Sequence, residues 1–555
     1  MPQETPPESQ HFKAEHHAGR LAADARTVSA VTLLSRFAGL AREVLTARIF
    51  GDTAIGSAFA AGFQAPNLFR RLFGEGALSA AFIPEYTTLD NRDPRLASRF
   101  ALRILSWLLL LTVGITILAE IALLVALVAL PANPGRDLSL RLIMLMLPYM
   151  PLVCLAAVLG GMLQVHGRFA ASSAGPVLMN AMVVAVGLYF LLTGRFGDAR
   201  VAYLLGAVIV LSGITQVWWF ARLLRPHLLR GGDDAAAAEA GARTMKRFVP
   251  AAIGLGTLQI NTFLDTLLAM WPIWVGPTVL GFAYPMDASS NVLLAAAQRL
   301  YQFPLGVFGI AVATAIFPML SRHAAQPAAF LHTLRRGIRL SLFIGIPASV
   351  GLFMVRLPAI AVPFSGGSTG FSAQGVERSA AVLGGFALAI WAYSLNHVLT
   401  RAFYANGDTK TPMRLAVAMV VLNFLLNVLL MWPLREAGLA YSTAITAGVQ
   451  VLILLVLANR FAPPGESLAD RHTMLAIARI ALAAGAMAMA VWAAQHAVSW
   501  GPGWLGKLGS LAAAVIVGGW AFLGAAAALR CQELRWLTHR RTHETATTGP
   551  THPNE

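Results

Sequence analysis

Five arginines lie within hydrophobic stretches of this chain, where charged side chains are rare. An arginine at the centre of a membrane helix costs about 2.5–3.5 kcal/mol on insertion scales. That cost predicts that these side chains line a water-filled cavity instead of facing lipid. Guanidinium groups stay charged and hold phosphate oxygens in pairs, so the cavity would attract a diphosphate-like anion. The five are Arg36, Arg42, Arg70, Arg71 and Arg299.

Two glutamates are placed to orient these arginines. Glu43 lies seven residues after Arg36 and shares its helix face, and Glu75 lies four residues after Arg71. The alternative is purely structural, because an ion pair of Glu43 with Arg36, or of Glu75 with Arg42, would simply hold helices together. The sequence leaves both interpretations open.

Pro66 and Asn67 directly precede the Arg70–Arg71 pair. A proline inside a helix removes one backbone hydrogen bond and bends the helix. We therefore predict a kink or break at this point, which would place the arginines at a hinge.

A second polar set lies in the later hydrophobic stretches: Asp265, Asn396 and Thr400, with Asn423 and Asn427 four residues apart. Carboxylate, amide and hydroxyl oxygens at membrane depth can bind Na⁺ or carry a proton. The alternative is hydrogen bonding between helices. A possible Na⁺ site at Asp265, Asn396 and Thr400 is the functional interpretation.

Composition indicates a membrane protein. The chain has 555 residues, of which 57% are hydrophobic and only 12% charged, and its mean hydropathy is +0.64. The net charge of +16 is not accompanied by a basic, aromatic-rich soluble domain, so we expect no nucleic-acid partner. No nucleophile elbow, zinc-ligand cluster or P-loop is found, which favours a transporter without a cofactor over an enzyme.

Hydropathy predicts an all-α polytopic membrane protein with about fourteen membrane helices. Placing both termini in the cytoplasm puts 25 basic residues in inner segments and seven in outer ones, as the positive-inside rule requires. The predicted helices span residues 27–50, 54–86, 99–130, 138–165, 172–193, 199–223, 246–270, 286–320, 328–362, 378–405, 411–432, 437–460, 471–496 and 505–530.

A weak internal repeat divides the chain into two halves. The segment Gly76–Pro84 resembles Ile310–Pro318, and the spacing from Pro84 to Pro318 defines the repeat offset. Six helices per repeat would relate the halves by an axis along the membrane normal, with a cavity between them. The predicted parts are a cytoplasmic tail (1–26), an N-terminal six-helix lobe (27–223), a cytoplasmic linker (224–245), a C-terminal six-helix lobe (246–460), two C-terminal helices (461–530) and a cytoplasmic tail (531–555).

These motifs resemble the MurJ/MviN lipid II flippase family, within the multidrug/oligosaccharidyl-lipid/polysaccharide exporter superfamily. The resemblance is densest over Ser35–Pro84 and returns at Gln298–Ser321 and Phe403–Pro412. It implies two pseudo-symmetric lobes around a central cavity and two C-terminal helices that form a groove for a lipid tail. It also implies that Arg36, Arg42, Arg70 and Arg299 are the family's cavity arginines, with Arg71 as the second member of the Arg-Arg pair. Glu75 matches the glutamate of the family's Glu-Gly-Ala motif.

One position departs from the family pattern. Members often carry aspartate before the Ala-Phe of the second helix, and here Ser57 occupies that position in Gly56–Phe59. This puts the aspartate's gating role in doubt, although the nearby Asp52 is a candidate substitute.

The resemblance implies a flippase that moves undecaprenyl-pyrophosphate-linked peptidoglycan precursor across the bacterial inner membrane by alternating access. We expect a monomer that contacts membrane lipids and delivers its product to outer-leaflet cell-wall polymerases, driven by membrane potential or by Na⁺ or H⁺. Three alternatives stay open: a flippase for another polyprenyl-linked oligosaccharide, a drug/cation antiporter, and a membrane glycosyltransferase with Asp52 and Asp287 as its candidate carboxylates.

Overall fold

The computed structural model describes residues 30–71, 77–228, 234–306, 310–366, 370–498, 501 and 503–538. Glu75, the predicted tail 1–26 and residues 539–555 of the predicted tail 531–555 therefore lie outside the described residues. Residues 531–538 of that second tail are described, and most of them form a short helix. Apart from one two-stranded hairpin, Thr278–Val279 (β1) paired antiparallel with Phe282–Ala283 (β2), the described elements are helices. The all-α fold class is confirmed.

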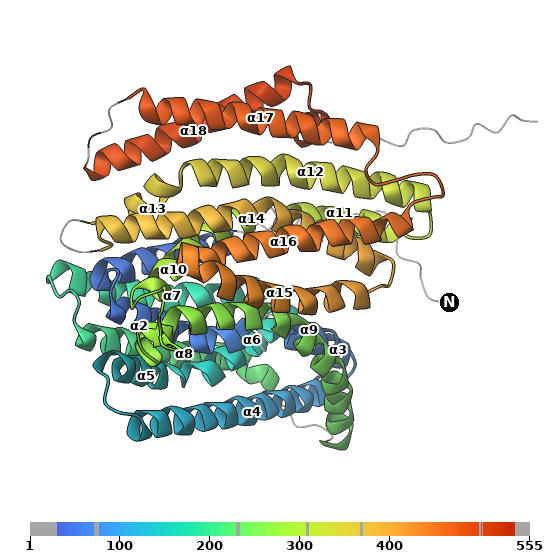
Figure 1. Cartoon of the computed structure of the whole chain (residues 1–555). Coiled ribbons are helices and arrows are strands. Elements are labelled where there is room, and N and C mark those ends of the chain that lie inside the picture. The colour runs from blue at the N-terminus through green and yellow to red at the C-terminus, as the bar shows by residue number, and fades with distance from the viewer. Residues whose placement is uncertain are drawn as a thin grey trace, which may run out of the picture. The chain divides into compact units, whose positions relative to one another are not determined.

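A helix over residues 30–50 begins the described chain (Figure 1). The helices that follow are α2 (Ala54–Phe69), α3 (Ala77–Arg92), α4 (Pro94–Ala129), α5 (Pro134–Met146), α6 (Tyr149–Val165), α7 (Phe169–Leu192), α8 (Ala199–Leu228), α9 (Asp234–Trp274), α10 (Ser290–Pro304), α11 (Ile310–His323), α12 (Pro327–Met354), α13 (Arg356–Phe364), α14 (Ala373–Ala405), α15 (Lys410–Leu434), α16 (Glu436–Ala458), the 3₁₀ turn η3 (Asn459–Phe461), α17 (Arg471–His496), α18 (Trp504–Ala528) and α19 (Gln532–Thr538).

The internal repeat is visible in the helix bounds. The first residues of α2 and α10 are separated by nearly the same number of residues as Pro84 and Pro318. The same holds for the first residues of α3 and α11. The helix α2 continues through Pro66 and ends at Phe69, followed by a π-helical turn at residues 70 and 71. The helix is therefore continuous through the proline, and its hydrogen-bonding pattern changes at residues 70 and 71.

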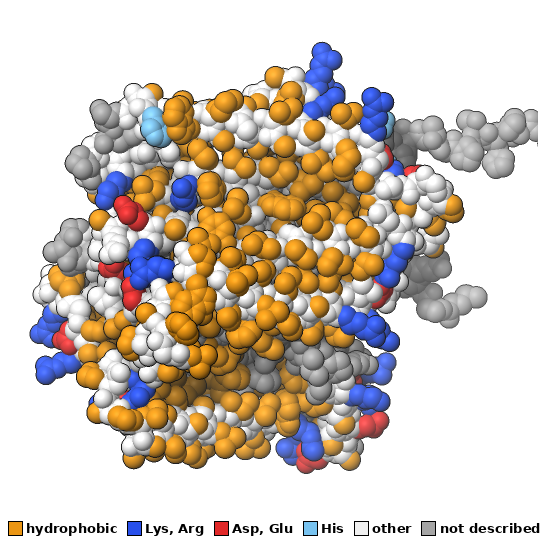
Figure 2. Space-filling view, in the orientation of Figure 1, with side chains coloured by type: hydrophobic (Ala, Val, Ile, Leu, Met, Phe, Trp, Pro, Cys, Tyr) orange, Lys and Arg blue, Asp and Glu red, His pale blue; other side chains and the backbone are white. Residues whose placement is uncertain are grey.

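Ten helical spans in the described part of the chain are long and apolar enough to cross a membrane. The predicted count of fourteen is not reached by this measure. The predicted spans 54–86 and 286–320 are each described as two helices of 14–16 residues, too short for a bilayer singly. Figure 2 shows hydrophobic side chains along α4 and charged ones near its start, as expected for a lipid-facing helix.

The described chain forms two compact units. The first consists of Met1–Phe303, Arg356–Phe386 and Lys410–Thr446. In it α6 packs on α8, α2 on α5, and α3 and α4 on α9. Phe82 stacks on Phe100 at 5.4 Å between ring centroids, in a core that holds α3 against α4. Most of the segment predicted as a linker is helical, because α8 extends to Leu228 and α9 begins at Asp234.

The second unit consists of Pro304–Val355, Ala387–Thr409 and Ala447–Glu555. The helices α17 and α18 lie side by side, and α17 packs on α12 (Figure 1). The short helix α19 is attached to α12 by an ion pair of 2.6 Å between Arg339 and the buried Glu533. The α17–α18 pair corresponds to the two C-terminal helices expected from the resemblance.

An ion cluster in the first unit joins the segment before α10 to α14 and α16. Arg378 donates to Asp287 and to the buried Glu436, each at 2.7 Å, and Arg435 approaches Asp287 at 3.3 Å. Charge-assisted, partly bidentate pairs of this kind fix the relative position of the three elements.

This cluster predicts an acid-sensitive contribution to stability. Burial by itself would raise the pKa of Asp287, but hydrogen bonds from Arg378 and Ser289 lower it to about 2. Because the folded-state pKa lies below the unfolded value, the stabilisation is fully present above pH ~4 and lost as the pH falls through about 2. We expect the difference in Tm between wild type and Asp287→Asn in detergent to be constant from pH 7 to 5 and to shrink below pH 4. A difference that persists undiminished at pH 2 would contradict this.

Candidate functional site

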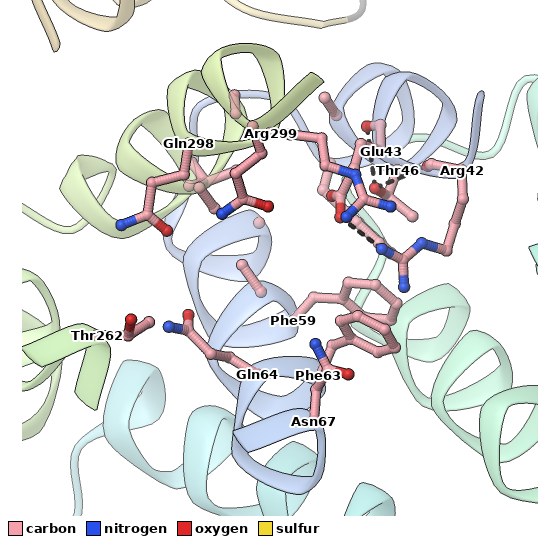
Figure 3. A pocket seen from close by; sticks show the side chains of 18 of the residues that line it. Arg42, Glu43, Thr46, Phe59, Phe63, Gln64, Asn67, Thr262, Gln298 and Arg299 are labelled. Atoms are coloured by element: carbon pink, nitrogen blue, oxygen red, sulfur yellow. Dashed lines mark hydrogen bonds and ion pairs between the residues drawn. The ribbon is translucent and has the colours of Figure 1, made fainter. Parts of the chain in front are cut away.

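A polar pocket lies within the first unit (Figure 3). The helix over residues 30–50 and helices α2, α9 and α10 form its walls, and Phe364 at the end of α13 also lines it. About 1010 Å³ of space lies between the walls, part of it open to solvent. The charged and polar lining residues are Arg42, Glu43, Thr46, Gln64, Asn67, Arg71, Gln259, Thr262, Gln298, Arg299 and Gln302.

Arg42 is buried on the wall formed by the first helix, with 4% of the residue exposed. Its Nη2 donates to the carboxylate of Glu43 at 2.5 Å, and its guanidinium carbon lies 3.8 Å from the ring centroid of Phe63. Its Nε is buried and has no hydrogen-bond partner among the described residues. Buried donors are nearly always paired in native proteins, so this N–H is placed to donate to an anionic ligand in the pocket.

Arg299 of α10 reaches across to the first helix. Its guanidinium carbon lies 3.3 Å from the position that a Cβ would take on Gly39, and its Nη2 lies closer still. Figure 3 shows Arg299 and Arg42 on the same side of the open space. Gly39 is thus the residue that allows two arginines from distant parts of the chain to converge on one pocket.

Gly39 provides a test that leaves every charge in place. A methyl group there would overlap the Arg299 guanidinium, which would have to move away from the pocket. We expect Gly39→Ala to lower transport at least tenfold without loss of the folded protein. Gly114, whose Cβ position has nothing within 4 Å, is the matched control. Activity measured in membranes would contradict the packing if Gly39→Ala were as active as Gly114→Ala.

The other predicted arginines differ in position. Arg71 lines the pocket, whereas Arg36 and Arg70 are not among its lining residues. Arg70 donates through Nε to Asn67 Oδ1 at 2.7 Å, so Asn67 orients an arginine next to the pocket while also lining it. The buried Pro66 lies in the same turn of α2. The pocket thus combines three of the five predicted arginines.

Glu43 has a different partner from the one considered in the sequence. It pairs with its neighbour Arg42 and not with Arg36 in the contacts that the structure gives. Among the described residues that line the pocket, Glu43 is the one carboxylate, and Arg42, Arg71 and Arg299 are the cations. This described lining carries a net positive charge, which suits an anion with more than one negative charge.

Ser57 joins the two repeats. Its Oγ accepts the backbone N–H of Val292 at 3.2 Å, and its carbonyl oxygen accepts Asn291 Nδ2 at 3.0 Å. Positions 57 and 291 are 234 residues apart, the offset of the repeat. The hydroxyl thus caps the first turn of α10, which a carboxylate at this position could also do.

Asp52 accepts hydrogen bonds at the N-terminal end of a different helix, α14. It accepts Ser372 N at 3.0 Å and Ser372 Oγ at 2.5 Å, just before α14. Both candidate carboxylates of a glycosyltransferase are thus engaged by protein groups, Asp52 here and Asp287 in the ion cluster.

The residues proposed for Na⁺ fall in different units. In the first unit, Asp265 is buried and accepts Asn427 Nδ2 at 2.7 Å, and Asn427 also contacts Asn423 at 3.2 Å. Asn396 and Thr400 lie in the second unit, where they contact each other at 3.4 Å. The described residues contain no cluster of three or more His, Cys, Asp or Glu side chains placed to hold a metal ion. The hydrogen-bond partner that the structure gives Asp265 is Asn427 of α15, which in turn contacts Asn423.

Sequence reasoning missed the amides of the pocket. Gln64, Gln259 and Gln298 line it together with Thr262 and Phe63. A usable signal was present, because Gln64 and Gln298 are separated by the repeat offset, as Pro84 and Pro318 are. Single glutamines in apolar helices attract less attention than arginines, since their burial costs less.

Comparison with known proteins identifies close relatives of the sequence. A family model described as lipid II flippase MurJ matches residues 46–509. A probable lipid II flippase MurJ from Vibrio cholerae serotype O1 is 31% identical over 496 residues, which cover 85% of this chain and 89% of that protein.

Solved structures agree on the fold. A lipid II flippase MurJ in an inward closed conformation matches with a TM-score of 0.71 and 20% identity, covering 91% of this chain and 99% of that one. An inward-facing multidrug resistance MATE family transporter of the MOP superfamily matches with a TM-score of 0.60 and 15% identity. The match covers 79% of this chain and 98% of that transporter. At these identities the likeness concerns the fold alone.

Proposed function

This chain belongs to the lipid II flippase MurJ family, and we propose that it moves lipid II, the polyprenyl-pyrophosphate-linked peptidoglycan precursor, from the inner to the outer leaflet of a bacterial membrane. It is a multi-pass membrane protein of a transporter family, with ten candidate spans in its described part. The observation that carries the substrate assignment is the pocket that Arg42, Arg71 and Arg299 line together, with Glu43 as the one carboxylate of its described lining.

The pocket supports this function through the chemistry of a diphosphate. Each guanidinium presents parallel N–H donors that match two phosphate oxygens, and it remains charged at any cellular pH. Arg42 and Arg71 come from the first repeat and Arg299 from the second. A ligand held by both repeats can couple its binding to their relative movement, as alternating access requires.

In this mechanism the diphosphate lies among the arginines while the polyprenyl tail stays in lipid beside the protein. The α17–α18 pair is the candidate surface for the tail. With both termini in the cytoplasm, an inward-negative membrane potential, worth about 2.3 kcal/mol per charge per 100 mV, favours outward movement of the bound anion. The protein works as a monomer and delivers lipid II to outer-leaflet cell-wall polymerases.

Return of the empty carrier is coupled to Na⁺ or H⁺ in this proposal. Asp265 with Asn427 and Asn423 offers buried oxygens suited to a small cation. Asp265→Asn should remove the dependence of transport on the cation gradient in vesicles. Unchanged cation dependence in that variant would exclude Asp265 as the coupling group.

The rival functions fit the pocket less well. A drug/cation antiporter would require net negative charge around its ligand, and this pocket has the opposite balance. A glycosyltransferase would require free carboxylates, whereas Asp52 and Asp287 are bound to Ser372 and Arg378. A flippase for another polyprenyl-pyrophosphate oligosaccharide shares the anion chemistry and is the second candidate.

Depletion in cells tests the proposal. Cells that lose this protein should accumulate lipid II that is inaccessible from the outer leaflet, while total lipid II is maintained or rises. Re-expression of the chain should restore access within minutes. Accumulation of a different polyprenyl-linked sugar, with normal access to lipid II, would favour the second candidate. Loss of lipid II synthesis itself would favour an enzyme.

A further inference from the structure

The pocket has two chemically different walls. In Figure 3, Arg42, Glu43 and Thr46 lie on one side of the open space, while Gln64, Thr262 and Gln298 lie on the other. We use the name amide wall for the second side together with the other glutamines that line the pocket: Gln64, Gln259, Thr262, Gln298 and Gln302. It contains no charged residue and comes from α2, α9 and α10.

The amide wall is built into the repeat. Gln64 of α2 and Gln298 of α10 occupy equivalent positions of the two repeats, and both line the pocket. The Oε1 of Gln259 is buried and has no hydrogen-bond partner among the described residues. Buried polar atoms are nearly always paired in native proteins, so this acceptor points to a ligand that donates a hydrogen bond.

The amides of this wall are uncharged, so they cannot form the charge-assisted hydrogen bonds by which arginines bind a diphosphate. They match groups that both donate and accept, such as hydroxyl and N-acetyl groups. In a glycosylated polyprenyl diphosphate the first sugar is attached directly to the second phosphate. A diphosphate among the arginines therefore places that sugar beside the uncharged residues that line the same pocket.

We propose that the amide wall is a saccharide subsite that binds the first N-acetylated sugar of the substrate. This inference rests on the proposed function, since it requires the diphosphate to lie among the arginines. The wall then sets specificity: a lipid with the sugar gains hydrogen bonds, and a bare lipid diphosphate leaves these amides unpaired. Sites built to hydrogen-bond a group discriminate strongly against ligands that lack it.

The test measures binding of two lipids to the purified full-length protein in detergent. One is undecaprenyl pyrophosphate, and the other carries a single N-acetylhexosamine on the diphosphate and no peptide. Wild type should bind the glycosylated lipid at least tenfold more tightly. Gln64→Leu and Gln298→Leu should each weaken that lipid about tenfold and change the bare lipid by less than twofold. Gln374→Leu, at an exposed position on α14, is the matched control.

The outcomes separate the two claims. Equal affinity of wild type for both lipids, or equal weakening of both by the glutamine variants, would overturn the saccharide subsite and leave the anion site intact. Failure of wild type to bind either lipid would instead contradict the proposed function. If a leucine variant is unfolded by its Tm, Gln64→Asn and Gln298→Asn, which shorten the amide by one methylene, provide the same comparison.

Discussion

Arg42→Ala should reduce lipid II translocation at least 30-fold while the protein still folds and inserts. Arg42 is buried against Phe63, and its Nε lacks a partner among the described residues, so its donors are already in place for an anion. Truncating one partner of a buried, hydrogen-bonded charge pair costs about 2–5 kcal/mol, and each 1.36 kcal/mol is tenfold. Outer-leaflet lipid II measured in cells that depend on the variant gives the result.

Two comparisons define what Arg42 contributes. Arg42→Lys keeps the charge but loses the planar pair of donors, so it should restore only part of the activity. Arg92→Ala, at an exposed position at the end of α3, changes the net charge equally and should have little effect. Full activity of Arg42→Ala would mean that Arg42 serves only its ion pair with Glu43.

Arg299→Ala should have an effect of similar size for a different reason. It removes the second repeat's arginine from the pocket, so the remaining cations come from the first repeat alone. The diphosphate would then no longer connect the two repeats, and we expect loss of transport to exceed loss of binding. Comparing lipid affinity in detergent with translocation in vesicles separates these two quantities.

The matched control for Arg299 is Arg322→Ala, near the end of α11 in the same repeat but not among the pocket-lining residues. It should transport normally. If Arg299→Ala lost binding and transport in the same proportion, Arg299 would be an ordinary ligand contact with no special role in coupling the repeats.

Much of the fold could be predicted because long apolar runs and the positive-inside bias can be recognised along the sequence, without knowing which helices are in contact. The arginines were found for the same reason, since charge in an apolar stretch is conspicuous. Which of them meet could not be predicted. Arg42 and Arg299 converge because Gly39 leaves room for a side chain from α10, a contact between helices that are far apart in the sequence. Arg36 and Arg70 also lie in apolar stretches of the sequence, but they are not among the residues that line the pocket.

The cation residues illustrate the opposite limit. Asp265, Asn396 and Thr400 were grouped by type, but type does not determine which helices are neighbours. Within the first unit, the contact of α9 with α15 brings Asn427 to Asp265, a pairing that residue type alone does not indicate. Gln64 and Gln298 were overlooked although the repeat relates them, because an uncharged amide is a weak signal until a pocket is seen around it.

The most direct measurement is an experimental structure of the protein with lipid II bound. The account predicts the diphosphate within hydrogen-bonding distance of at least two of the guanidinium groups of Arg42, Arg71 and Arg299, about 2.7–2.9 Å from nitrogen to oxygen. A diphosphate bound elsewhere, with these three arginines paired only to carboxylates of the protein, would contradict it.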